Sequence, residues 1–396
     1  MKIAFITGCL ESGRDGIGDY TRLLARECVS QGYECCLLSL NDHFLTEISQ
    51  SEVTADEVKI PMLRLPVSMP WNQRTAHAEN FLALCQPDWV SLQFVPYAFQ
   101  EKGIVIGLSK WLRPLVQGRQ LHIMFHELWI GHHVGAKLKE RLIGTVQKFF
   151  ILRLVKHLQP IVLHTSNLAY VAMLQQLGIS ASRLPMFGAI PIAEKNGDNW
   201  LFPKLQKLGL DIKTENRNQF WLFGFFGTLH PTWPAEPLFT YLNQAGIQHQ
   251  RRIAFISVGR LGTGEMLWES LSNNYSSQFV FLRLGEQLPN KISEVLNSID
   301  FGITPTPYLL TGKSGTIAAL LEHGLPVIVN DNGFQFASCP MLTHSGEKTL
   351  HLMDSSLPNQ ISHYVVNRKP AQSRLQCVAI QFLEDLSNLS KTKCNN

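Results

Sequence analysis

Short apolar runs alternate with helix-length amphipathic stretches along nearly the whole chain of 396 residues. The apolar runs are rich in β-branched and aromatic residues, which is typical of buried strands. Alternation of strands and helices in this way predicts βαβ units, that is, parallel sheets with helices on their faces. We therefore predict an α/β fold.

The alternation falls into two blocks of similar size, separated by a polar stretch at 193–199. The break is expected within 191–215. The first helix is expected at 16–31 and the last at 372–389. The expected strands are 3–7, 34–40, 89–95, 121–126, 160–165 and 184–190 in the first block, and 219–226, 251–258, 278–284, 300–304 and 326–330 in the second.

These blocks predict two Rossmann-like domains facing a central cleft, at 1–192 and 193–370, and a C-terminal segment at 371–396. Ligands bind at the carboxyl ends of strands in open parallel sheets, so the functional residues are expected in the loops that follow the strands.

Composition excludes several classes of protein. Hydrophobic residues make up 45% and charged residues 17%, which is globular rather than disordered, and the net charge of +4 does not argue for nucleic acid. The first residues become polar too early for a secretory signal, and none of the eight cysteines forms a Cys-x-x-Cys pair. We therefore expect a cytoplasmic protein without a zinc site.

Several familiar motifs fail on inspection. A phosphate loop ending at 312–316 would need glycine where Pro307 stands. A zinc-protease helix starting at His126 would need a second histidine where Ile130 stands. The glycine pair Gly16 and Gly18 lacks the third glycine of a dinucleotide fingerprint. We therefore expect neither a metal nor a nicotinamide or flavin cofactor.

Two candidate loops lie in the first block. Gly16 and Gly18 stand at a predicted helix start, where backbone amides and the helix dipole favour a bound anion. The alternative is a tight turn before a helix cap. His126 stands at the end of a predicted strand, where it would donate a hydrogen bond to a ligand or act as acid or base; the alternative is a structural histidine.

Two further candidates lie in the second block. Residues 313–316, with Lys313, Ser314, Gly315 and Thr316, precede a helix and predict a phosphate site; the alternative is a serine cap beside a solvated lysine. Glu322 closes the apolar stretch 317–321 and needs a polar partner such as a ribose diol. Gly227 ends a strand and allows backbone approach to a ligand, with His230 or Trp233 nearby; the alternative is turn chemistry.

With these residues in place, the chain resembles the nucleotide-sugar-dependent glycosyltransferases of the GT-B fold, in particular their large retaining group of bacterial mannosyl- and glucosyltransferases. The similarity is carried by 16–34, 125–129, 164–179, 184–192, 223–229 and 298–329, in the family's order. The last segment is the most specific.

The resemblance implies that the donor nucleotide binds the C-terminal domain, with Glu322 on the ribose hydroxyls. It places the glycine loop near the donor diphosphate and His126 near the transferred sugar, and it returns the last helix to the N-terminal domain. It implies no metal and no cofactor besides the nucleotide sugar, which is a co-substrate.

The chain departs from the family at the residues that handle charge. Ser314 replaces the first glutamate of the family's pair, Thr228 replaces its arginine, and its lysine falls near Trp233. That arginine and lysine neutralise the leaving diphosphate. Lys313, the helix start at Ser314–Thr316 and Arg260 are the candidate replacements.

The leading hypothesis is therefore glycosyl transfer, of a hexose in the first instance, from a nucleoside-diphosphate sugar to an acceptor hydroxyl with retention of configuration. The first alternative is a non-catalytic relative that binds a nucleotide sugar. A phosphorylase-like enzyme is third, because no pyridoxal-phosphate lysine motif is found. The acceptor, whether a polysaccharide, a lipid-linked sugar or a small molecule, would meet loops at 42–75.

Residues 102–156 carry ten lysines and arginines but two glutamates, together with Trp111 and the apolar cluster 149–152. A basic amphipathic surface of this kind favours peripheral contact with the anionic inner face of a membrane. The alternative is two solvated helices whose apolar sides face the core.

Overall fold

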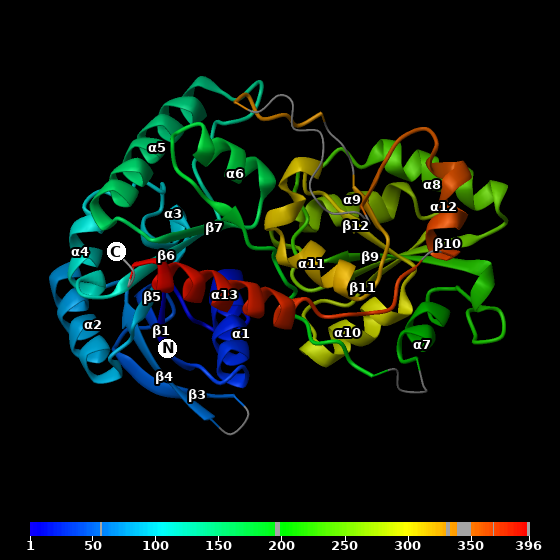
Figure 1. The fold of residues 1–396 in the computed structure, drawn as a ribbon. Helices are drawn as coiled ribbons and strands as arrows, with labels where there is room; N and C mark the ends of the chain where they lie inside the picture. Colours follow the sequence, from blue (N-terminus) through cyan, green and yellow to red (C-terminus); the bar gives the residue numbers. More distant parts are fainter. Residues whose placement is uncertain (56–57, 195–198, 330–332, 339–349, 367, 394–396) are drawn as a thin grey trace. The chain divides into compact units, whose positions relative to one another are not determined.

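The computed structural model describes residues 1–55, 58–194, 199–329, 333–338, 350–366 and 368–393, and the chain forms two compact units (Figure 1). Unit 1 comprises Met1–Ala189, Gln335–Thr343 and Leu375–Asn396, and unit 2 comprises Ile190–Phe334 and His344–Arg374. The sequence placed the corresponding domain limits at 192/193 and 370/371.

Unit 1 is built on one sheet with the strand order β3-β4-β2-β1-β5-β6-β7-β8. Every neighbouring pair is parallel except β3 and β4, which form an antiparallel hairpin at one edge. The strands are β1 (Lys2–Thr7), β2 (Glu34–Asp42), β3 (Ser49–Ala55), β4 (Val58–Pro66), β5 (Trp89–Phe94), β6 (Gln120–Phe125), β7 (Val162–Thr165) and β8 (Ser182–Arg183).

The helices of unit 1 follow the strands, as βαβ units require. They are α1 (Gly16–Ser30), α2 (Trp71–Cys85), α3 (Pro96–Phe99), α4 (Leu108–Val116), α5 (Leu138–Leu158), α6 (Leu168–Gln175) and α13 (Leu375–Lys393). Helix α13, red in Figure 1, lies beside α1, in blue. Its Phe382 is fully buried, with its ring centroid 5.8 Å from that of Phe5 on β1, so the end of the chain forms part of this core.

Unit 2 has a fully parallel sheet with the order β11-β10-β9-β12-β13-β14. Its strands are β9 (Phe220–Phe226), β10 (Arg252–Val258), β11 (Val280–Arg283), β12 (Phe301–Thr304), β13 (Val327–Val329) and β14 (Leu350–Leu352). Its helices are α7 (Leu201–Gln206), α8 (Glu236–Gln248), α9 (Glu265–Asn274), α10 (Pro289–Ser298), α11 (Gly315–Glu322) and α12 (Leu357–Val366), with short 3₁₀ turns η1 (Arg217–Gln219), η2 (Gly262–Gly264) and η3 (Tyr308–Lys313).

The sheet of unit 2 is buried on both faces, and aromatic rings fill one of them. Phe223 on β9 stacks on Phe301 of the neighbouring β12 with ring centroids 4.8 Å apart, and Phe255 on β10 lies 5.5 Å from Phe223. Leu222, Ala254 and other small aliphatic residues pack on the opposite face. Buried on both sides, strands of this kind read as continuous apolar runs.

The predicted α/β class, the first and last helices and the strands other than 184–190 are confirmed to within a few residues; Asn330, the last residue of one predicted strand, lies outside the described residues. The strand predicted at 184–190 was wrong, because β7 pairs instead with the two-residue strand β8, which ends just before residue 184. The segment 42–75, expected as loops, contains the β3–β4 hairpin and the start of α2. Among the described residues, no helix has the length and apolar character to cross a membrane.

Candidate functional site

Helix α11 of unit 2 begins with a serine cap, which the sequence analysis gave as the alternative to a phosphate site. The Ser314 hydroxyl accepts a hydrogen bond from the backbone N–H of Ile317 at 3.3 Å, and the helix follows directly from η3, which ends at the half-buried Lys313. Gly315 is the first residue of the helix, so its amide belongs to the unpaired N-terminal turn. Both interpretations of this segment, cap and anion site, are compatible with that geometry.

A cavity of about 200 Å³ lies at this helix start, beside the carboxyl ends of β9 and β12. It brings together residues from two segments that the sequence analysis singled out separately: Thr228 from one, and Ser314 and Thr316 from the other. The other lining residues described are Phe225, Phe226, Ile303, Thr304, Pro305 and Thr306. Five of the nine lining residues carry a hydroxyl group, so the cavity offers neutral hydrogen-bonding groups beside the positive end of a helix dipole.

Gly227 shapes the wall of this cavity. Its φ of +79° is in the left-handed region, and a Cβ atom there would lie 3.4 Å from the Thr316 hydroxyl oxygen. Its N–H donates to the Val258 carbonyl oxygen at 2.9 Å, which holds the turn after β9 against the end of β10. Glycine is therefore required for the backbone conformation and keeps the helix start open.

Lys313 and Arg260, the cations predicted to replace the family's arginine and lysine, are not among the described residues that line this cavity. Arg260, in the loop after β10, forms an ion pair with Glu286 at 2.8 Å, and both side chains are about half exposed, at 47% and 62%. Trp233, which stands near the position of the family's lysine, is 5% exposed and packs edge-on against Phe225 with ring centroids 5.4 Å apart. That position therefore belongs to the core of unit 2.

Glu322 is 2% exposed at the end of α11, and the chain itself supplies a partner for its carboxylate. One carboxylate oxygen accepts a hydrogen bond from the backbone N–H of Arg374 at 3.3 Å, while the Glu322 carbonyl oxygen accepts from Gln372 at 2.7 Å. Glu322 is not among the described residues that line the 200 Å³ cavity. The sequence analysis predicted that this carboxylate needs a polar partner, but not that the backbone N–H of Arg374 is one.

In unit 1, the glycine loop is occupied by acidic side chains of its own. Asp15 caps α1 by accepting from the Gly18 N–H at 2.6 Å, and Asp19 accepts from the Gly13 N–H at 3.1 Å. A Cβ atom at Gly18 would lie 2.7 Å from the Cys9 carbonyl oxygen, so this glycine serves close packing. A Cβ at Gly16 would meet no atom within 4 Å, which leaves Gly16 as the open part of the loop.

His126 follows β6 and is 3% exposed. Its Nε2 atom lies 2.9 Å from the Gln93 amide oxygen, and its ring meets Tyr20 of α1 edge-on at a centroid distance of 4.9 Å. Burial lowers the pKa of His126 to about 3, so the imidazole is neutral at pH 7. At neutral pH the imidazole is therefore a neutral hydrogen-bonding group, with one donor and one acceptor nitrogen.

Four buried polar atoms in this part of unit 1 have no hydrogen-bond partner among the described residues. They are His126 Nδ1, Tyr20 Oη, Thr165 Oγ1 and Ser166 Oγ. Phe125 pairs with Thr165 across β6 and β7, so His126 and Ser166 are the next residues on neighbouring strands. Unsatisfied buried polar atoms are costly, so these four atoms are candidates for hydrogen bonds to a ligand: three stand at the carboxyl ends of β6 and β7, and Tyr20 on α1 packs against His126. The sequence analysis missed Thr165 and Ser166, although they stand at the end of a predicted strand as His126 does.

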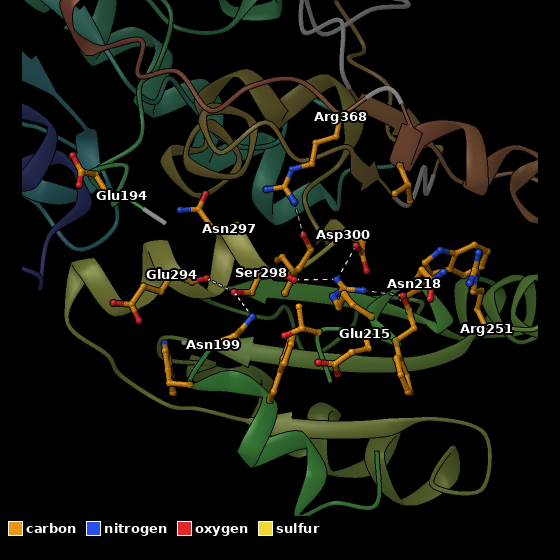
Figure 2. A pocket seen from close by; sticks show the side chains of 18 residues that line it. Glu194, Asn199, Glu215, Asn218, Arg251, Glu294, Asn297, Ser298, Asp300 and Arg368 are labelled. Carbon is orange, nitrogen blue, oxygen red and sulfur yellow. Dashed lines mark hydrogen bonds and ion pairs between the residues drawn. The ribbon is translucent and has the colours of Figure 1, made fainter. Parts of the chain in front are cut away.

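A larger cavity of about 810 Å³ lies in unit 2 at the amino ends of β9 and β12 (Figure 2). Its polar groups largely bind one another or the backbone: Arg217 pairs with Asp300 at 2.8 Å, Asn199 donates to the Ser298 hydroxyl at 3.0 Å, and Arg368 donates to the Ile299 carbonyl oxygen at 2.7 Å. It contains none of the site residues that were predicted from the sequence. In the part of the chain that the structure describes, no three His, Cys, Asp or Glu side chains are grouped to hold a metal ion.

No family model matches the chain, and no curated protein matches it. The fold does match solved structures. These include Anabaena Alr3699/HepE in complex with UDP and glucose, with a TM-score of 0.57 at 16% identity over 100% of both chains. The catalytic domain of starch synthase IV from Arabidopsis thaliana, bound to ADP and acarbose, matches with a TM-score of 0.54 at 11% identity over 98% of this chain and 99% of that one. A putative UDP-N-acetylglucosamine 2-epimerase from Listeria monocytogenes matches with a TM-score of 0.54 at 10% identity over 99% and 97%. The chain therefore has the GT-B fold, with two α/β units built on largely parallel sheets.

Proposed function

We propose that this protein transfers a sugar, a hexose in the first instance, from a nucleoside-diphosphate sugar to an acceptor hydroxyl with retention of configuration. The observation that carries the proposal is the 200 Å³ cavity of unit 2, where the start of α11 meets Thr228, Thr316 and the Gly227 turn. Helix N-termini bind phosphate groups through their free amides and dipole. Structural neighbours crystallised with UDP and glucose or with ADP support a nucleotide ligand.

In this proposal the bond between the anomeric carbon and the diphosphate oxygen breaks, and a bond forms between the anomeric carbon and the acceptor oxygen. The acceptor hydroxyl gives its proton to the departing diphosphate, and the nucleoside diphosphate leaves. The protein must stabilise the charge that develops on the leaving diphosphate. The amides of Gly315 and Thr316, the Ser314 and Thr228 hydroxyls, and the cations Lys313 and Arg260 are the groups we assign to that task. No metal takes part in this scheme.

We assign Glu322 to the donor ribose as a second step of the proposal. A carboxylate accepts hydrogen bonds on both oxygens, which suits the two hydroxyls of a ribose diol, and Glu322 stands at the end of α11. Glu322→Gln keeps an acceptor for Arg374 but loses the charge, whereas Glu322→Ala loses both. Donor affinity should fall in both variants, and the melting temperature should fall mainly in Glu322→Ala. Full donor affinity in a folded Glu322→Ala would exclude the ribose assignment.

The proposal is tested by measuring the melting temperature of the protein with a panel of nucleotide sugars. A ligand that binds the native state alone stabilises it by about 2.7 kcal/mol at a concentration of 100 times its Kd. We expect one base and sugar to raise the melting temperature and then to release nucleoside diphosphate on incubation with acceptors. If every donor at millimolar concentration left the melting temperature unchanged, the proposal would be overturned. Product analysis by NMR distinguishes a transferred sugar from an isomerised one.

A non-catalytic nucleotide-sugar-binding protein is the second candidate, and one observation favours it. The described lining of the 200 Å³ cavity contains no lysine or arginine, and Trp233 is buried where the family's lysine would fall. Stable donor binding without release of nucleoside diphosphate in the presence of any acceptor would favour this candidate over the enzyme.

We also propose that unit 1 contacts the anionic inner face of a membrane through α5. Leu138, Leu142, Val146 and Phe149 are 71%, 61%, 40% and 56% exposed, and their spacing places them on one face of the helix. The exposed basic residues on this helix are Lys139, Arg141, Arg153 and Lys156. An apolar stripe bordered by basic side chains suits insertion at the headgroup level of an anionic bilayer.

Vesicle co-sedimentation at low salt tests this surface. We expect binding to vesicles that contain phosphatidylglycerol and loss of binding in the double variant Leu142→Ser, Phe149→Ser. The matched control is Leu84→Ser, which removes an 80% exposed leucine from α2. Equal sedimentation of the wild type with neutral and anionic vesicles would contradict the charge-dependent contact.

A further inference from the structure

An unbroken line of hydrogen bonds crosses the core of unit 1 from His126 to the C-terminal helix α13. It passes through His126, Gln93, Ser91, His122, His164 and Asp385. The successive donor–acceptor distances are 2.9, 2.8, 2.8, 3.1 and 3.1 Å. The first five side chains are buried, and Asp385 at the far end is 36% exposed.

The end of this line at His126 has a defined polarity. The Gln93 amide nitrogen donates to the Ser91 hydroxyl oxygen, so the Gln93 carbonyl oxygen is the atom that faces His126. A carbonyl oxygen accepts and does not donate. His126 Nε2 must therefore carry the proton.

The end at Asp385 requires the same polarity. An ionised carboxylate accepts but cannot donate, so His164 Nε2 carries the proton that faces it. Burial lowers the pKa of both His122 and His164, which keeps each imidazole neutral with one donor and one acceptor nitrogen. His164 Nδ1 then accepts from His122 Nε2, and His122 Nδ1 accepts from the Ser91 hydroxyl.

The hydrogen-bond directions required at the two ends are compatible at Ser91, whose hydroxyl accepts from Gln93 and donates to His122. Every proton in the line points from His126 toward Asp385. A reversed line would need a donor at position 385 and a flipped Gln93 amide. The carboxylate of α13 thus selects one of two arrangements that the intervening side chains could adopt, because each of them is both donor and acceptor.

We propose that Asp385 is a positioning residue that holds His126 in the tautomer protonated at Nε2, so that His126 Nδ1 is presented as a hydrogen-bond acceptor to a hydroxyl group of the ligand. Nδ1 is buried and has no hydrogen-bond partner among the described residues, as expected for a ligand contact. This reverses the expected role of His126, which accepts from the ligand rather than donates to it. A ligand whose matching hydroxyl is replaced by fluorine loses the contact, since fluorine has no proton to donate.

The tautomer is measured by NMR of the unliganded protein labelled with ¹⁵N-histidine, in which protonated and bare ring nitrogens have well-separated shifts. The His126 signals are identified by their loss in His126→Gln. We expect Nε2 protonated and Nδ1 bare in the wild type at pH 7.5. A wild-type His126 protonated at Nδ1 would overturn the proposal without any further variant.

The role of Asp385 is tested by Asp385→Lys, which places a donor where the line needs an acceptor. We expect His126 to change to the tautomer protonated at Nδ1, or to populate both. Glu384→Lys is the matched control, because Glu384 is the exposed neighbour on α13 and its replacement makes the same change in charge. An unchanged His126 tautomer in a folded Asp385→Lys would overturn the proposal.

Ser91→Ala removes the hydroxyl at the middle of the line while Asp385 stays in place. In that background, Asp385→Lys should no longer change the His126 signals. An effect that persisted would come from the charge alone and would count against transmission through the line of hydrogen bonds. Only the identity of the ligand rests on the proposed glycosyl transfer. If the His126 tautomer depends on Asp385 but no nucleotide sugar binds, the proposed function is wrong and the positioning role of Asp385 is still supported.

Discussion

Replacing His126 by glutamine should flatten the pH dependence of folding stability. The pKa of His126 is about 3 in the folded protein, against about 6.5 for an exposed histidine. The unfolded chain therefore binds the proton first as the pH falls, and each step of acidification between those values favours unfolding. The stabilisation from keeping His126 neutral is fully present above the unfolded pKa and is lost as the pH falls toward 3.

The size of the effect follows from the two pKa values. At pH 5 an exposed imidazole is almost fully protonated and the buried one is not, so His126 alone lowers the free energy of unfolding by about 2 kcal/mol relative to pH 7.5. The side chain is 3% exposed, so solvent screening does not reduce this figure appreciably. His126→Gln keeps a side-chain N–H for Gln93 but removes the titrating group.

The measurement is urea unfolding of the wild type and His126→Gln at pH 7.5 and pH 5.0. We expect the loss of stability on acidification to be smaller in the variant by about 2 kcal/mol. His77→Gln, at an exposed position on α2, is the control and should behave as the wild type does. Equal acid sensitivity in the wild type and His126→Gln would refute the argument that burial keeps this imidazole neutral.

Three further predictions concern unit 2. Ser314→Ala removes the cap of α11 and should lower the free energy of unfolding by about 1 kcal/mol while weakening donor binding; urea unfolding and calorimetry measure the two. Lys313→Ala should reduce turnover by about tenfold or more with little change in melting temperature, and an unchanged rate would remove Lys313 from the diphosphate site. Glu286→Gln releases Arg260 from its exposed ion pair and should tighten donor binding by about fivefold at most; weaker binding would contradict Arg260 as a phosphate ligand.

Local patterns in the sequence were sufficient for most of the fold. The continuous apolar runs of β9 and β10 and the glycine-terminated α1 each have a short-range signal, and all three were predicted. The β3–β4 hairpin was missed because Ser49–Ala55 is a polar edge strand with one apolar valine near its centre, and a strand at a sheet edge is stabilised mainly by its partner. No period within the strand itself indicates that pairing.

The candidate site was predictable where its residues belong to one turn and its short helix, and much less so where they are distant in the chain. Ser314 and Thr316 follow from a helix-start pattern, and the cavity joins them to Thr228. Asp385 bonds to His164 across 221 residues, and neither has a local signal for the other. A buried histidine looks the same in sequence whether it is isolated or a link between two ends of a unit.

In the proposed function, the charge at the 200 Å³ cavity distinguishes a glycosyltransferase from a relative that only binds the donor. Its described lining offers hydroxyl groups, from Thr228, Thr304, Thr306, Ser314 and Thr316, where the family it resembles has an arginine. Neutral hydroxyls make weaker hydrogen bonds to an anion than a guanidinium does, so they give less stabilisation to a departing diphosphate. Binding energy shared equally by the bound donor and the transition state does not accelerate the reaction. In the proposed reaction we therefore assign most of the acceleration to the cations Lys313 and Arg260, and removing both should abolish turnover while donor binding through the helix and hydroxyls persists.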